Sequence, residues 1–134
     1  MSYGVGAALQ SAIFQRLTAD TTLGSFVGTN IFDAIPPGPL PGLFVSLGPE
    51  EVSDSSDKSG HGATHIFTIS VVTDAAGFQT AKDTASAVSD SLIDAELALT
   101  RGRLVSLRFL RAEAKRASGT RRIDLKFRAR VEDT

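Results

Sequence analysis

Apolar residues recur along this chain with two periods, one near 3.6 and one of two, and these periods outline its secondary structure. Residues 3–17 have apolar side chains at i, i+3, i+4 and i+7, which predicts a helix with one buried stripe. Residues 77–94 repeat this spacing more clearly, at Phe78, Ala81, Ala85, Val88 and Leu92. We therefore expect two helices, each of which packs by one face.

Between the two predicted helices, three apolar segments have the composition of strands. The first, residues 31–35, is short. It ends at four prolines and two glycines, which predict an extended connector over residues 36–42 because proline cannot donate a ladder hydrogen bond. Residues 43–47 and 65–73 follow, and the second of these is rich in β-branched and aromatic side chains. We expect each of the three segments to be a strand.

The C-terminal part has the period of two that marks a half-buried strand. Residues 104–112 alternate, and their predicted core face consists of Val105, Leu107 and Phe109. Residues 122–131 alternate without error, and their apolar face consists of Ile123, Leu125, Phe127, Ala129 and Val131. The stretch 114–119 joins the two strands, so we expect Lys115 and Arg116 at the tip of a hairpin.

This order of elements predicts an α+β fold, with an antiparallel sheet of about four to five strands and two helices packed on one face. The length of 134 residues fits one domain, residues 1–134, around a single core. Residues 48–62 break the apolar pattern, because serines, glycines and carboxylates dominate there. We expect a mobile acidic loop that carries Glu50, Glu51, Asp54 and Asp57.

Charge divides the sequence into an acidic and a basic part. Residues 101–134 hold eleven lysines and arginines against four carboxylates, a net charge of +7. Residues 1–100 hold three against eleven, a net charge of −8, so the whole chain carries only −1. Such an asymmetry concerns partners more than folding, because separated charges steer association.

Composition argues against several classes of protein. Cysteine is absent, which excludes a disulfide framework, and the N-terminus has no charged segment followed by an apolar run that would predict secretion. The longest nearly apolar run, near residues 42–47, is far shorter than the roughly 20 residues of a membrane helix. We expect a soluble protein, made in a reducing cytoplasm, with no membrane partner.

Sequence motifs for catalysis are missing as well. The chain has no Gly-x-Ser-x-Gly elbow, no phosphate-binding Gly-x-x-x-x-Gly-Lys and no His-Glu-x-x-His zinc helix. Its two histidines, His61 and His65, have no cysteine or ordered carboxylates beside them, so we expect them to be exposed at a loop edge. Residues 54–60 do not match a calcium-binding loop, because the bidentate glutamate that such a loop requires is absent. We therefore predict no enzyme, no cofactor and no metal.

The polar face of the final strand admits two interpretations. Its cations either solvate an open sheet face and discourage aggregation, or form a contact surface for an acidic partner or for phosphate. The separate acidic segment favours a contact surface. The candidate interface residues are Arg122, Lys126, Arg128, Arg130, Lys115, Arg116, Glu50, Glu51, Asp54 and Asp57.

Several local sequences, in their order and spacing, resemble one protein family. They are residues 31–37 (IFDAIPP), 41–48 (PGLFVSLG), 72–78 (VTDAAGF), 97–99 (LAL) and 120–129 (TRRIDLKFRA). Together they look like the tail-completion, or tail-terminator, proteins of long non-contractile tails in siphophages and gene transfer agents. That family often has an aromatic residue where this chain has Val72.

The resemblance implies a structural virion protein without catalytic residues. Such a subunit forms a ring, a hexamer, at the head-proximal end of the tail tube, stops tube polymerisation and joins the tail to the head connector or stopper. Its implied partners are further copies of itself, the tail tube protein and the connector, while DNA passes through the lumen without specific binding. The implied location is the head–tail junction of a phage or gene transfer agent particle, assembled in the bacterial cytoplasm.

Three alternatives stay open at this point. The basic strand suits a nucleic-acid-binding module, although no exposed aromatic residue accompanies it and the pI of about 6.1 is low. Another head–tail joining protein, an adaptor or stopper, keeps the structural class, although adaptors tend to be mainly helical or barrel-like. A small hydrolase would need a pocket that the sequence does not place.

Overall fold

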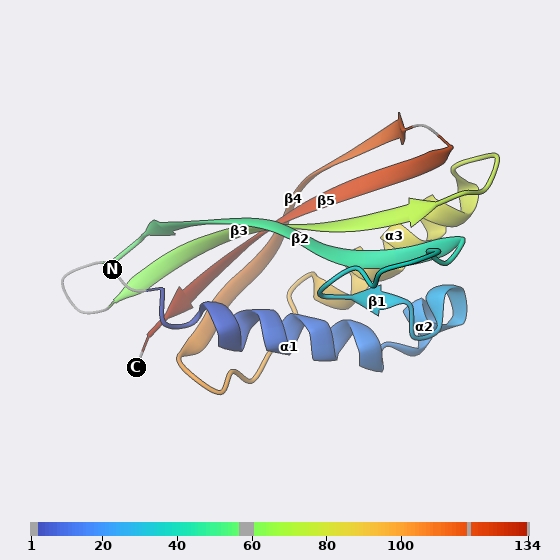
Figure 1. Cartoon of the computed structure of the whole chain (residues 1–134). Coiled ribbons are helices and arrows are strands. Elements are labelled where there is room, and N and C mark those ends of the chain that lie inside the picture. Colours follow the sequence, from blue (N-terminus) through green and yellow to red (C-terminus); the bar gives the residue numbers. More distant parts are fainter. Residues whose placement is uncertain (1–2, 57–60, 118, 134) are drawn as a thin grey trace.

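The computed structural model describes residues 3–56, 61–117 and 119–133. Figure 1 shows a long, twisted sheet with helices packed along it. In chain order the elements are α1 (Gly6–Ala19), α2 (Thr21–Val27), β1 (Ile31–Phe32), β2 (Leu43–Asp54), β3 (Gly62–Thr73), α3 (Gln79–Leu92), β4 (Arg103–Ala117) and β5 (Thr120–Glu132). The predicted α+β class is confirmed.

The five strands lie side by side in the order β1-β2-β3-β5-β4. All neighbours run antiparallel except β1 and β2, which are parallel, so the sheet is mixed where the sequence predicted an antiparallel one. The parallel pair arises because the long connector after β1 returns the chain to the same end of the sheet before β2 begins. The strands β1 and β4 form the two edges.

The core lies between the helices and one face of the sheet. The alternation predicted for β5 is confirmed, since its five apolar side chains are all buried. At the centre Phe127 stacks on Phe67, with ring centroids 5.6 Å apart, and meets Phe109 edge-on at 5.8 Å. The helices contribute the apolar stripes that their spacing predicted, including Leu9, Ile13, Leu17, Ala81, Val88 and Leu92.

One helix, α2, is not among the elements expected from the apolar periods, because Asp20 and Gly24 are residue types that disfavour a helix. Asp20 instead begins this helix: its side chain accepts a hydrogen bond of 2.9 Å from the backbone N–H of Leu23. Gly24 is tolerated because Leu23 and Val27 are buried in the core. In the described part of the chain, no helix has the length and apolarity needed to cross a membrane.

The expected acidic loop over residues 48–62 is replaced over most of its length by strand. After an irregularity between Leu47 and Glu50, β2 continues to Asp54 and pairs with β3 as far as Ala63. Pairing with β3 supplies the backbone hydrogen bonds that this polar segment could not supply alone. Residues 57–60 lie outside the described residues, and so does the candidate residue Asp57.

Two predictions about β4 are also corrected. The strand runs to Ala117 and its pairing with β5 ends at Thr120, so Lys115 and Arg116 lie within the strand and not at a hairpin tip. Register shifts at residues 104–106 and 109–111 leave Val105 and Leu110 outside the regular pairing, and both are exposed. Such bulges cannot be predicted from a period of two, because each inserts one residue that resets the alternation.

Candidate interaction surface

The face of the sheet opposite the helices is crossed by rows of like-charged residues. Across the β4–β5 pair, Arg128 lies opposite Arg108, and Lys126 lies opposite Arg111. Like charges directly opposite each other on neighbouring strands destabilise a sheet. We define the basic face as these four residues together with Arg130, the next outward-pointing cation of β5: Arg108, Arg111, Lys126, Arg128 and Arg130.

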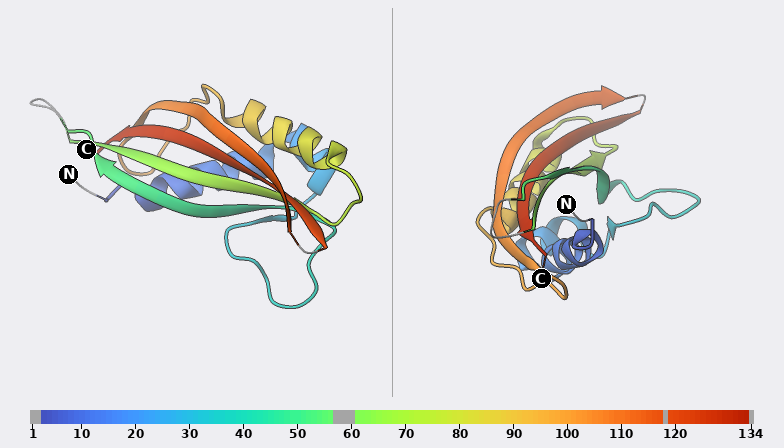
Figure 2. Two further views of the ribbon diagram at one scale, coloured as in Figure 1. Left: turned by 90° about the horizontal axis from the view of Figure 1, so that it is seen from above. Right: turned by 90° about the vertical axis from the view of Figure 1, so that its left-hand side faces the viewer.

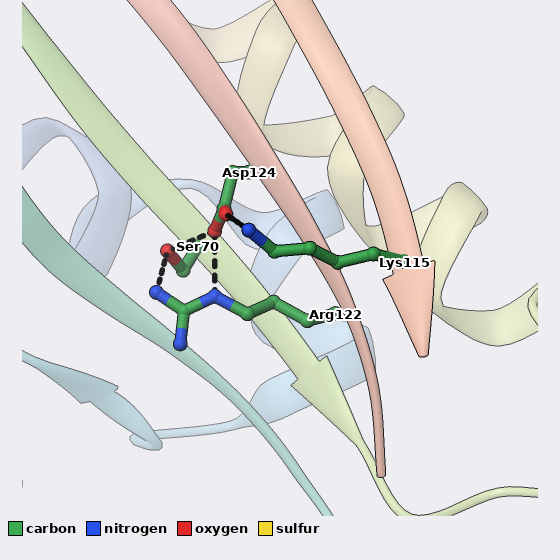
Figure 3. A network of polar contacts seen from close by, with 4 residues as sticks. All are labelled: Ser70, Lys115, Arg122 and Asp124. Atoms are coloured by element: carbon green, nitrogen blue, oxygen red, sulfur yellow. Dashed lines mark hydrogen bonds and ion pairs between the residues drawn. The ribbon is translucent and has the colours of Figure 1, made fainter. Parts of the chain in front are cut away.

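Next to the basic face, one carboxylate pairs with two further cations (Figure 3). Asp124 accepts hydrogen bonds from Arg122 Nε at 2.7 Å and from Ser70 Oγ at 2.6 Å, and its second oxygen lies 3.1 Å from Lys115 Nζ. Burial would raise the pKa of the Asp124 carboxyl, but the hydrogen bonds from Ser70, Arg122 and Lys115 outweigh burial and lower the pKa. Arg122 and Lys115 are therefore satisfied within the subunit.

Replacing Asp124 by asparagine is expected to lower the free energy of unfolding at neutral pH by about 1–3 kcal/mol, because charge-assisted hydrogen bonds are lost at a side chain only 17% exposed. Because the pKa of Asp124 is lowered in the folded protein, its stabilising effect is fully present at pH values above the unfolded-state pKa of about 3.9. The effect is lost as the pH falls through the folded-state pKa. The free energies of unfolding of the two proteins, measured by denaturant titration, should therefore become equal at acidic pH. Glu113→Gln, on the facing strand position, is the control and should show no such loss.

The cations of the basic face lack such compensation. Within the described residues, no carboxylate forms an ion pair with Arg108, Arg111, Lys126 or Arg128. Arg130 donates a long hydrogen bond, 3.4 Å, to the backbone oxygen of Ser55. A hollow of about 410 Å³ opens beside Arg111 and Lys126, and its charged lining is mixed, with the carboxylates Glu50, Glu51, Glu113 and Asp124 and the cations Arg111, Lys115, Arg122 and Lys126. Uncompensated positive charge therefore lies along the basic face, beside a hollow whose own charged lining is balanced.

The structure does not bring all ten predicted interface residues together. Glu51 lies on the same side of the sheet as the basic face, but Glu50 points to the helical side. Asp54 accepts hydrogen bonds from the side chain and backbone of Ser56, and these lower the pKa of its carboxyl. Arg116 pairs with Arg121 on the helical side of the hairpin. The described members of the predicted set therefore lie on two different faces of the sheet.

A cluster at the N-terminal end escaped the sequence analysis. His65, expected to be exposed, is 0% exposed, and its Nδ1 lies 3.2 Å from a carboxylate oxygen of Glu50. Tyr3 stacks over the imidazole at 6.1 Å and donates a hydrogen bond of 2.6 Å to the other oxygen of Glu50. The available signal was the period of two in β3, which puts His65 on the face of Phe67 and Ile69.

Tyr3 reports on this cluster because it is the only tyrosine of a chain without tryptophan. The hydrogen bond to Glu50, the negative charge of that carboxylate and, least, burial raise the pKa of the Tyr3 phenol. We expect the ultraviolet titration of Tyr3 to have its midpoint above the ordinary tyrosine pKa of about 10. Glu50→Gln should lower the pKa, whereas Glu51→Gln, one residue away, should leave it unchanged. An unchanged titration in Glu50→Gln would contradict the contact.

The candidate site is thus a charged surface on the open face of the sheet. In the three described ranges, no group of three or more histidines, cysteines or carboxylates could hold a metal ion. Uncompensated charge on an open sheet face is typical of a protein that binds other macromolecules. The fold and the surface therefore define an assembly protein.

Comparison with known proteins gives the family. The sequence matches the tail completion protein gp17 family over residues 11–132, and the chain belongs to that family of structural tail proteins. Its fold is similar to a chain in the solved structure "Virion of native gene transfer agent (GTA) particle", at 62% identity and a TM-score of 0.93, with 98% of this chain and 99% of that chain covered. No curated protein matches. The family resemblance inferred from the sequence is confirmed.

Proposed function

We propose that this protein forms a ring at the head-proximal end of a phage-like tail tube, ends polymerisation of the tube and joins the tail to the head connector. The protein acts by binding, not by catalysis. Membership of the tail completion family supports a role in the tail. The similar chain in a gene transfer agent virion supports a place in a particle of that kind.

The single observation that carries the proposal is the basic face. Cross-strand repulsion between Arg108 and Arg128, and between Arg111 and Lys126, costs the free subunit a few tenths to about 1 kcal/mol per pair. An acidic surface on a docking partner removes that repulsion and replaces it with attraction. We propose that the basic face binds the tube protein or the connector.

Two further points of the proposal concern the ring. A head-to-tail ring joins unlike patches of identical subunits, and a hexamer is the size that the family resemblance implies. DNA passes through the bore without specific binding, so the bore is expected to be acidic or neutral, because arginines would retain the phosphate backbone. The basic face would then point away from the bore, and a ring with Arg128 and Arg130 lining it would contradict this arrangement.

Deletion of the gene tests the proposed function in particle-producing cells. Without the protein, tubes should vary in length and heads should remain unjoined, and a plasmid copy should restore joined particles. Native mass spectrometry and negative-stain images of the purified protein or of tail ends should show a ring. Normal tails on heads in the deletion strain would exclude the proposal.

A second candidate function, binding to the DNA backbone, is favoured by the same five uncompensated cations. Mobility-shift titrations over a range of salt concentrations separate the two functions. The tail role predicts no stable complex with duplex DNA near physiological ionic strength. A complex that weakens steeply with salt, and that is lost in Arg128→Glu, would favour DNA binding instead.

A further inference from the structure

The connector between β1 and β2 is an exposed apolar arm. Residues 33–42 project from the body of the molecule (Figure 2) and contain four of the five prolines of the chain. Gly38 adopts a φ of 90°, which lets the arm turn back on itself. Two apolar side chains remain in solvent, Ile35 at 54% exposure and Leu40 at 47%. A proline-rich segment is extended before it binds, so docking costs it little conformational entropy.

An apolar groove lies at the other edge of the sheet, between α3 and β4. Its volume is about 430 Å³; the apolar part of its lining is Ala85, Phe109, Ala112, Ala114, Ile123 and Leu125, and polar residues of α3, among them Lys82 and Asp90, line its other side. The groove exists because α3 packs mainly on β3 and β5, which leaves the helical side of β4 uncovered. Phe109, one of the larger apolar residues in this lining, is 41% exposed.

The outer edge of β4 is covered over only part of its length. The segment after α3 reaches it through a backbone hydrogen bond of 3.3 Å from Asp94 N–H to the oxygen of Leu107. Beyond that point, residues 108–117 are paired with β5 on one side, and no strand of the described residues pairs with their other side. An open edge of this length invites another chain. The open half is the half that borders the groove.

The arm and the groove of one molecule cannot meet. The arm leaves the sheet at β1, and the groove lies at β4, four strand spacings of about 4.8 Å away. The arm is also held at both ends and projects outward (Figure 2). Contact between arm and groove therefore joins two copies through unlike surfaces, the arrangement that closes into a ring when it is repeated.

The distribution of charge along the chain also supports a second copy as the partner. Residues 17–56, which include the arm, contain five carboxylates and no lysine or arginine. Strand β4 contains five cations and one carboxylate. The groove itself is lined by one cation and one carboxylate, Lys82 and Asp90, so the unlike charges lie in the segments that flank the arm and the groove. A second copy thus brings a segment rich in carboxylates to a strand rich in cations.

We infer that residues 33–42 of one subunit dock into the groove between α3 and β4 of the next subunit. The inference rests on the proposed ring and adds to it the joint between neighbours. The apolar side chains of Ile35 and Leu40 cover Phe109 and the alanines of the groove. The unlike charges of the two edges fix the order of the subunits.

Cross-linking tests this joint directly, because the chain contains no cysteine. Leu40→Cys and Ala112→Cys proteins are mixed, assembled and treated with a short thiol-to-thiol cross-linker. We expect a covalent dimer from this pair. The matched pair of Leu40→Cys with Thr18→Cys, an exposed position on α1, should give none. Native mass spectrometry of the same samples measures assembly independently.

Each outcome decides between the proposals. An oligomer that yields no Leu40–Ala112 cross-link, or the same yield from the control pair, overturns the arm-and-groove joint while the ring survives. A protein that stays monomeric in particles as well as in solution overturns both. Leu40→Asp gives a second measurement: it should abolish the oligomer without changing the Tm. Ile93→Asp, at a comparable exposure of 44% but outside the groove, should preserve the oligomer.

Discussion

Replacing Arg128 by glutamate is expected to abolish head–tail joining while the free subunit becomes slightly more stable. The substitution converts the repulsion between Arg128 and Arg108 into an attraction, which should raise the free energy of unfolding by a few tenths to about 1 kcal/mol. At a charged interface the same change places a carboxylate against an acidic partner, which costs several kcal/mol, or a loss of at least a hundredfold in affinity. Denaturant titrations and counts of joined particles measure the two effects.

Joining should fall while the free energy of unfolding rises, so the variant separates a lost interface from a lost fold. A variant that merely unfolded would lose joining and stability together. Arg16→Glu makes the same change of net charge on α1, in the helical layer, and should leave joining intact even though it loses a hydrogen bond to the backbone of Ser91. Joined particles at normal yield from Arg128→Glu would show that the basic face only solvates the sheet.

Replacing Phe127 by alanine is expected to cost about 3–5 kcal/mol, a large part of the stability of a domain of this size. Phe127 is fully buried and lies between Phe67 and Phe109, so its removal leaves a cavity that rigid strands on both sides cannot close. Most of the protein should become insoluble or unfold at growth temperature. Thermal and denaturant unfolding of the purified variant measure the loss.

Phe109→Ala is the matched control for this prediction. Its ring contacts the same Phe127, but it is partly exposed in the groove, so its removal should cost less than half as much. The two variants also separate folding from assembly. Phe109→Ala should retain the fold and weaken the contact between subunits, whereas equal stability losses would show that the groove is closed in solution.

The sequence determined those features that depend on local order along the chain. The periods of 3.6 and two located α1, α3 and β5 and gave their buried faces, because a regular element repeats its environment at fixed intervals. The charge asymmetry and the family resemblance need no tertiary structure either. The missed helix α2 is short, and its start depends on a cap that only the folded loop confirms.

Only the tertiary structure decided which charges meet and which surfaces stay open. Register across the sheet places Arg128 opposite Arg108. It also brings Asp124 into contact with Arg122 and Lys115, and Glu50 into contact with His65. Edges, grooves and uncompensated charge arise between segments far apart in sequence, and two bulges in β4 shift that pairing by single residues. Local pattern specifies the elements, whereas strand order and register, set by packing of the whole chain, place the surfaces that bind.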